Sequence, residues 1–60
     1  MEWVVEATGE WSDGTRIQRR FRVEAPDEDA ARERAGIEFL EWTDDKAELL
    51  CTKIIQEPVV

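Results

Sequence analysis

The sequence predicts an α+β fold with the element order ββαβ: a three-stranded antiparallel sheet in the order 2-1-3, with one helix packed on one face. Three observations predict this class. A turn centred on Ser12-Asp13-Gly14 separates two segments rich in β-branched and aromatic residues. A segment with helical spacing of apolar residues follows Asp27. A last aliphatic segment, which follows a polar loop, ends at Pro58. A chain of 60 residues makes one domain, 1–60.

The first two strands are expected at about 2–11 and 15–24, and the loop between them decides how they pair. A two-residue turn at Asp13-Gly14 would place Glu6 opposite Phe21 and bring a charge into the apolar row. A three-residue loop, with Gly14 in the left-handed conformation, shifts the pairing and separates apolar from charged side chains. We therefore predict the three-residue loop, with Trp3 opposite Val23, Val5 opposite Phe21, Glu6 opposite Arg20 and Glu10 opposite Arg16.

A helix is predicted at about 27–41, because Pro26 ends the second strand and Asp27 offers a side-chain cap. Its inward stripe consists of four residues that fall on one side of a helix: Ala31, Ala35, Phe39 and Trp42. Oppositely charged residues four positions apart are expected on its exposed flank, namely Glu28 with Arg32 and Arg34 with Glu38.

The final strand, expected at about 48–57, runs antiparallel to the first strand and pairs beside it. Regular alternation gives it two sets of side chains, which are Leu49, Cys51, Lys53 and Ile55, or Leu50, Thr52, Ile54 and Gln56. Either inward choice leaves at least two large aliphatic residues on the other face. One helix covers only one face, so the open face is expected to carry one of these sets together with Val4, Glu6, Thr8, Arg16, Gln18, Arg20 and Arg22.

Two aliphatic residues of the helix, Ile37 and Leu40, lie off the inward stripe and close to Gly36. Glycine costs about 1 kcal/mol relative to alanine inside a helix, which indicates a close approach at this point. Two interpretations are open. Either Ile37 packs under the last loop and Leu40 under the final strand, or both residues belong to an interface with a partner.

The composition limits the classes of partner that the chain is expected to bind. Its 15 acidic and 8 basic residues give a formal net charge of -7, which disfavours a general affinity for nucleic acid or anionic lipid. A chain of this length buries only about 60% of its extended surface, so a second chain would help to stabilise it. No apolar run approaches the roughly 20 residues that span a bilayer. The single cysteine and the lack of a signal-peptide pattern lead us to expect a cytoplasmic protein that does not bind membranes.

The residue inventory does not favour an enzyme. The chain has no His and no Tyr, and its carboxylates are spread mostly along solvent-facing positions. The acidic groups at 27–29 and 44–45 lack the alternating spacing of a calcium loop. We therefore expect no catalytic residue, no metal, no cofactor and no small-molecule substrate. The lone Cys51 is expected to be a buried, inert thiol.

These observations predict a small acidic, noncatalytic protein-interaction module that forms a homodimer or binds one protein partner through its open sheet face. The candidate partner-binding residues are Val4, Arg20, Arg22, Leu49, Ile55, Ile37 and Leu40. One alternative is an acidic mimic of nucleic acid that inhibits a nucleic-acid-binding enzyme through Asp27, Glu28, Asp29, Glu33, Asp44, Asp45 and Glu48. A second alternative is binding of single-stranded nucleic acid through Arg16, Arg19, Arg20 and Arg22, which lie near Trp11 and Phe21.

The Ala-, Arg- and Glu-rich helix after Val23-Glu24-Ala25-Pro26-Asp27, with the Trp-rich hairpin before it, resembles small uncharacterised accessory proteins of bacteriophages that infect high-GC bacteria. The resemblance extends from Trp3 to Trp42 and consists of composition and element order. It implies a nonessential role in host interaction or counter-defence. It transfers no functional residue to this chain.

Overall fold

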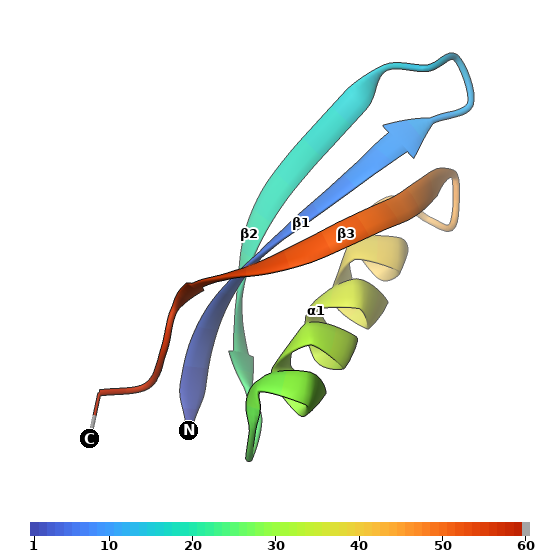
Figure 1. The fold of residues 1–60 in the computed structure, drawn as a ribbon. Helices are drawn as coiled ribbons and strands as arrows, with labels where there is room; N and C mark the ends of the chain where they lie inside the picture. Colours follow the sequence, from blue (N-terminus) through green and yellow to red (C-terminus); the bar gives the residue numbers. More distant parts are fainter. Residues whose placement is uncertain (60) are drawn as a thin grey trace.

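The computed structural model describes residues 1–59; Val60, the last residue of the predicted domain, lies outside the described residues. The element order is β1 (Glu2–Trp11), β2 (Arg16–Glu24), α1 (Glu28–Trp42) and β3 (Ala47–Gln56). The strands form one sheet in the order β2-β1-β3 with both pairs antiparallel. The helix lies against one face of this sheet (Figure 1). The predicted fold class, strand order and helix placement are therefore confirmed.

The hairpin between β1 and β2 has the predicted three-residue loop. The backbone N–H of Trp11 donates to the carbonyl of Thr15 at 2.9 Å, and Gly14 has a φ of 91°. A positive φ is reached without strain by glycine, which explains this residue at the end of the loop. All four predicted cross-strand pairs are present, from Trp3 opposite Val23 to Glu10 opposite Arg16.

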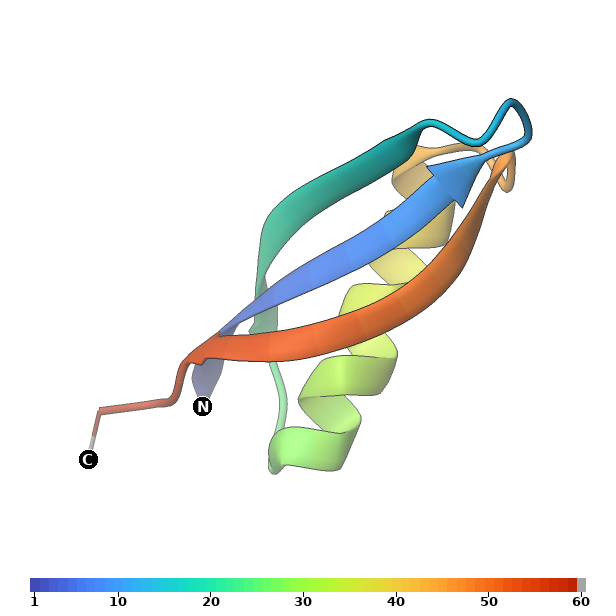
Figure 2. The ribbon, with the colours of Figure 1, turned by 45° about the horizontal axis from the view of Figure 1, so that its top comes forward.

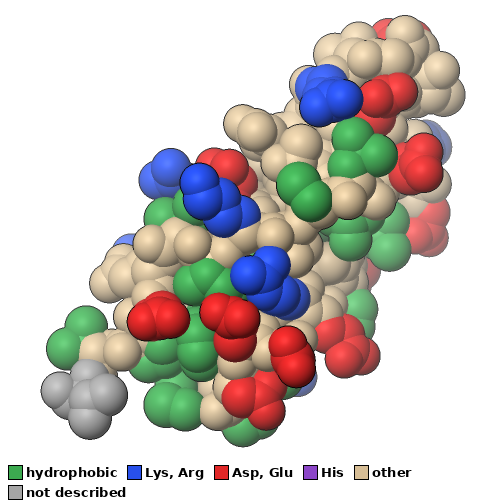
Figure 3. Space-filling view, in the orientation of Figure 1, with side chains coloured by type: hydrophobic (Ala, Val, Ile, Leu, Met, Phe, Trp, Pro, Cys, Tyr) green, Lys and Arg blue, Asp and Glu red, His purple; other side chains and the backbone are tan. Residues whose placement is uncertain are grey.

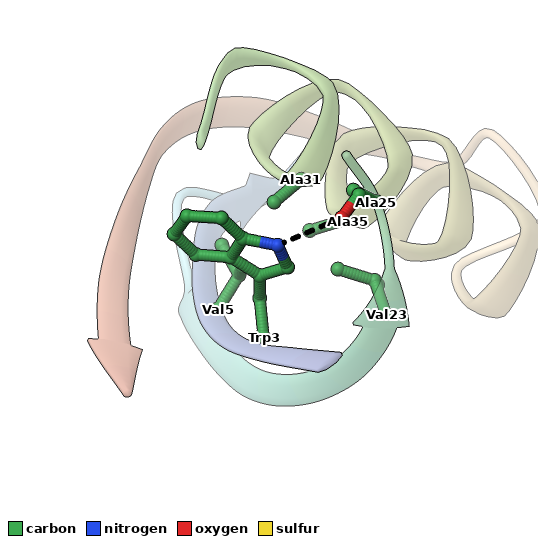
Figure 4. Packing of buried hydrophobic residues seen from close by; sticks show 6 residues of the cluster. All are labelled: Trp3, Val5, Val23, Ala25, Ala31 and Ala35. Carbon is green, nitrogen blue, oxygen red and sulfur yellow. Dashed lines mark hydrogen bonds between the residues drawn. The ribbon is translucent and has the colours of Figure 1, made fainter. Parts of the chain in front are cut away.

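One half of the core is built around Trp3. Its indole packs among Val5, Val23, Ala25, Ala31 and Ala35, as Figure 4 shows. The indole Nε1–H donates to the carbonyl of Ala25 at 3.0 Å, so the buried ring leaves no polar atom unsatisfied. The alanines of α1 have short side chains, which lets the helix approach the large tryptophan ring closely.

The other half of the core is built around Phe39, which is fully buried with Ala7 and Ala47. Its ring lies directly on Gly9 of β1. A Cβ atom at Gly9 would overlap this ring and would lie 2.6 Å from the carbonyl oxygen of Glu48. The contact between Phe39 and the sheet therefore requires glycine at this position of β1.

The helix α1 begins and packs largely as predicted. The carboxylate of Asp27 accepts a hydrogen bond from the backbone N–H of Ala30 at 2.8 Å, which is an N-cap. Of the inward stripe, the first three residues are fully buried, whereas Trp42 is 43% exposed. The expected ion pair of Glu28 with Arg32 forms at 3.8 Å. The pair of Arg34 with Glu38 is not among the ion pairs within residues 1–59.

The strand β3 departs from the regular alternation expected of it. Its register with β1 shifts twice, once between Val4 and Val5 and once between Thr8 and Gly9. The residues left without a partner at these shifts are Ile55 and Leu50, so β3 bulges at both positions. Both regular sets of inward residues are therefore wrong. The residues opposite the covered side of β1 are Leu49, Thr52 and Ile54.

No helix within residues 1–59 has the length and apolar character needed to cross a membrane.

Candidate functional site

The face of the sheet opposite α1 carries no other element of the described chain, and we call it the open face (Figures 1 and 2). The strand pairing sorts its side chains into four rows that run across the sheet. From one end to the other, the rows are Arg22, Val4 and Gln56; Arg20, Glu6 and Lys53; Gln18, Thr8 and Cys51; and Arg16, Glu10 and Glu48. Each row takes one residue from each of the three strands.

The open face carries charged residues of both signs. Arg20 Nε lies 3.3 Å from Glu6 Oε2, and Arg16 Nε lies 3.7 Å from Glu10 Oε2. Ion pairs as exposed as these each contribute only about 0–1 kcal/mol to folding. Arg22 lies opposite Val4 and takes part in no ion pair within the described residues.

Apolar groups lie between these charges. The two bulges put Leu50 and Ile55 next to Cys51 and Gln56, whose partners on β1 belong to the open face. Leu50 is 43% exposed, and Ile55 is half-buried. Neither residue belongs to the buried clusters under the helix. The prediction that large aliphatic side chains remain outside the core therefore holds, although the bulges and not strand parity place them there.

Figure 3, which views the molecule from the side where β3 and α1 are visible, shows hydrophobic side chains in groups separated by basic and acidic ones. Such a mixed surface is typical of protein interfaces that form from separately folded chains. Cys51 is exposed, so the prediction of a buried thiol is wrong. Its neighbour Thr8 is the buried residue of that row, and it accepts a hydrogen bond from Gln18 Nε2 at 3.3 Å.

The structure divides the seven predicted partner-binding residues among three places. Four of them lie on the open face: Val4, Arg20, Arg22 and Ile55. Leu49 lies opposite Gly9 on the covered side and, like Leu40, packs against the Phe39 cluster. These two residues are therefore part of the core and do not line the open face.

Ile37 lies apart from both the core and the open face. It is 51% exposed on α1, where it borders a shallow groove with Ala25, Pro26 and Ala30. The interpretation that Ile37 packs under the last loop is therefore wrong. Leu40 packs against the buried cluster of Ala7, Phe39 and Ala47, the last of which belongs to β3. The close approach predicted at Gly36 is made by Leu49, whose Cδ2 would lie 3.0 Å from an added Cβ.

Two features of the surface were missed by the sequence analysis. The first is the position of Leu50 on the open face, because a bulge leaves no mark in the pattern of apolar residues. The second is a stack at the end of the helix, where the Arg19 guanidinium lies 4.6 Å from the centre of the Trp42 ring. A cation over an aromatic face contributes roughly 0.5–1 kcal/mol at exposed sites. In the hairpin register, the only signal of this stack is that Arg19 lies opposite Ala7, on the covered side of the sheet.

The opposite side of the molecule is acidic. Residues 27–46 contain eight acidic and three basic residues. Three of these acidic residues, Glu33, Glu38 and Glu41, border the groove that contains Ile37, together with Glu24 of β2. Within residues 1–59 no three His, Cys, Asp or Glu side chains are placed to hold a metal ion together.

Comparisons with protein-family models, curated proteins and solved structures gave no match to this chain.

Proposed function

We propose that this protein is a noncatalytic interaction module that self-associates through its open face, or binds one protein partner there. The observation that carries the proposal is the pair of bulges in β3. They place Ile55 beside Val4, and Leu50 farther along the strand beside Cys51, on a sheet face that no other element of the described residues covers. Exposed aliphatic groups among charges are typical of interface surfaces.

Self-association is the form that the charges favour. The open face carries basic residues on β2 and Lys53, and acidic residues at Glu6, Glu10 and Glu48. A twofold dimer brings the same patch of two chains together, so it needs a patch that contains both signs of charge. Among residues 1–59, only two large side chains are fully buried in the core, those of Val5 and Phe39. Burial of the open face in a dimer would add to this small core.

The test compares two variants with the same chemical change at opposite sides of the molecule. Leu50→Glu puts a charge on the open face, and Ile37→Glu puts a charge on the outer side of α1. Sedimentation velocity is measured for both variants and the wild type over about 1 to 100 µM, where weak dimers form. We expect the wild type and Ile37→Glu to dimerise and Leu50→Glu to stay monomeric. A wild type that is monomeric throughout this range would contradict self-association at micromolar concentrations.

The partner form is tested with the same proteins as baits in a pull-down. A partner of the open face is retained by the wild type and by Ile37→Glu and is lost with Leu50→Glu. Loss with Ile37→Glu instead would place the interaction on the helix. If the resemblance to phage accessory proteins holds, the partner belongs to the bacterial host.

A second candidate function is mimicry of nucleic acid, which the excess of acidic residues in 27–46 favours. In this case the acidic side would occupy a basic groove on a nucleic-acid-binding enzyme. We expect the enzyme to be captured from a bacterial lysate at low salt and released at high salt, because screening weakens exposed charges. Capture that does not change with salt would remove this candidate.

Direct binding of single-stranded nucleic acid has weaker support. Arg16 and Arg20 are paired with glutamates, and Arg19 is stacked on Trp42. Only Arg22 of the four arginines has neither kind of contact within residues 1–59. Binding of a fluorescent single strand at low salt, abolished by Arg22→Glu, would favour this function over the other two.

A further inference from the structure

The two edges of the sheet differ in how their backbone groups are satisfied. The β3 edge is interrupted by two bulges, and its Thr52 carbonyl accepts a hydrogen bond from Arg32 Nη1 at 2.6 Å. The β2 strand pairs with β1 without interruption over its whole length. Within residues 1–59 no strand lies on the outer side of β2. Proteins protect sheet edges with bulges, covering segments or charge, and β2 has only charge.

The backbone groups that point out of the β2 edge belong to every second residue. In an antiparallel pair, alternate residues exchange hydrogen bonds with the partner strand, and the others direct N–H and C=O away from it. Two hydrogen bonds at the ends of the hairpin fix this alternation: Trp11 N–H to Thr15 O at 2.9 Å, and Ala25 N–H to Met1 O at 3.0 Å. Odd-numbered residues of β2 therefore bond to β1. The outward groups belong to Arg16, Gln18, Arg20, Arg22 and Glu24.

A second copy of β2 is a poor occupant of this edge. Opposite residues in an antiparallel pair have numbers that add to a constant, so the possible registers can be compared directly. Every register that joins three or more of the outward residues places an arginine opposite an arginine. Arg20 faces Arg20 in the centred register, and Arg16 faces Arg22 in the next one. Like charges directly opposite each other destabilise a strand pair.

We propose that the β2 edge binds an extended acidic segment of a partner protein as a fourth strand of the sheet. Strand addition of this kind uses main-chain hydrogen bonds for affinity and alternate side chains for specificity. The other side of β2 shows the same chemistry, because β1 places Glu6 opposite Arg20 and Glu10 opposite Arg16. Acidic residues at alternate positions of an incoming strand would likewise lie beside the arginines. The hydrogen-bonding groups are those of the backbone edge of β2, which the function proposed above does not use, so the proposal goes beyond that function.

Arg22 gives this edge its strongest preference for an acidic strand. It is exposed and forms no ion pair within residues 1–59. A guanidinium group has five donors and binds a carboxylate with two hydrogen bonds.

Most of the excess negative charge of the chain lies in residues 27–46, on the helix and its adjoining loops. Beyond about 8 Å at physiological salt, screening weakens the repulsion from those charges.

The test uses the full-length protein and a synthetic peptide of about eight residues, a typical strand length, in which Glu alternates with Val. Both ends of the peptide are blocked. Amide hydrogen exchange is measured by NMR with and without the peptide. We expect slower exchange at Gln18, Arg20 and Arg22, and no change at Arg19 and Phe21, whose N–H groups already bond to β1. Only an added strand produces this alternation.

Two control peptides and two variants sharpen the test. A peptide with Lys in place of Glu, and one with N-methyl groups on alternate amides, should not bind. Arg22→Glu should weaken binding by at least about fivefold, which corresponds to one strong cross-strand pair. Arg34→Glu, which makes the same change on the helix, should leave it unaltered. The peptide comparison needs no variant, so it decides the question even if Arg22→Glu fails to fold.

Four results would overturn the proposal. Equal binding of the Glu and Lys peptides would show that charge does not select the strand. Binding without slower exchange at the even-numbered residues would place the peptide elsewhere. Slower exchange at those residues in the protein alone, as its concentration rises, would show that a second copy occupies the edge. A single-stranded oligonucleotide that displaces the peptide with higher affinity would identify nucleic acid as the occupant.

Discussion

Gly9 is the residue whose identity the fold constrains most directly. Phe39 rests on its Cα, and the β3 backbone passes close by at Glu48. No side chain fits between these neighbours. At Gly36, by contrast, an added Cβ would meet only the flexible end of Leu49. Two glycines in one chain thus have different tolerance for the same substitution.

Gly9→Ala should destabilise the protein by about 1–3 kcal/mol, the usual range for overpacking a core. Urea unfolding followed by tryptophan fluorescence measures this change. The matched control is Gly36→Ala, where improved helix propensity of about 1 kcal/mol offsets a small displacement of Leu49. If Gly9→Ala unfolded at the same urea concentration as the wild type, Phe39 would not pack on β1 as described.

Asp13 stabilises the hairpin loop through its charge. The backbone N–H of Thr15 donates to Asp13 Oδ1 at 2.9 Å, and this bond, with a second from the Thr15 side chain, lowers the pKa of the Asp13 carboxyl. A carboxyl with a lowered pKa in the folded state stabilises that state above its unfolded pKa. The stabilisation is lost as the pH falls through the folded pKa.

An NMR titration of the wild type should therefore show Asp13 losing its charge at a lower pH than an unstructured aspartate. Replacement by Asn or Ala should remove the pH dependence of the Thr15 amide resonance in the same acid range. An Asp13 that titrates at or above the ordinary aspartate pKa would contradict the hydrogen bond to Thr15.

At the scale of the elements, α1 depends on its first turn. Asp27 caps the helix, and Glu28 and Asp29 add negative charge next to the exposed N–H groups. The last turn has no basic residue to balance it. The helix therefore draws its electrostatic stabilisation from one end.

Asp27→Ala should destabilise the protein by about 0.5–2 kcal/mol, whereas Asp29→Ala should cost less because it removes charge but no cap. Thermal unfolding followed by circular dichroism gives both values. Equal effects of the two substitutions would show that the cap hydrogen bond to Ala30 adds nothing beyond its charge.

The hairpin was predictable from sequence, and the final strand was only partly so. Residues near the loop fix the register of β1 and β2, since only one loop length separates apolar from charged residues. In β3 the aliphatic residues are spread over both parities. Leu49 and Ile54 are five positions apart, so a regular strand would point them to opposite faces. Both pack under the helix, and the bulge at Leu50 makes this possible. The need for both residues to face the helix arises from the packing of α1 and from Gly9. A local pattern of apolar residues within β3 contains neither of these.

The candidate site was predictable to the same extent. Val4, Arg20 and Arg22 were placed on the open face because they belong to the hairpin, whose register follows from its loop. Leu49 was assigned there by regular alternation, and Leu50 was omitted for the same reason. The errors at Leu49 and Leu50 therefore have a single physical cause, the bulges of β3. Leu40 was misplaced for another reason, because it packs against the Phe39 cluster and belongs to the core.

At the scale of the whole molecule, the single helix α1 covers only one of the two faces of the sheet. The principal extents are 42 × 16 × 14 Å, and the hairpin extends beyond the end of the helix (Figure 1). The covered side holds the core, and most acidic residues lie on the helix and its adjoining loops. The open face holds mixed charges around Val4, Leu50 and Ile55. Burial of a face with this composition requires a partner surface that provides both apolar groups and both signs of charge.

The self-association of the open face is tested most directly by isotope-filtered NMR on an equal mixture of labelled and unlabelled protein. We expect intermolecular contacts among the methyl groups of Val4, Leu50 and Ile55, and none from Ile37. Intermolecular contacts that involve Ile37 instead, or a complete lack of intermolecular contacts at a concentration of about 1 mM, where even weak dimers are populated, would contradict it.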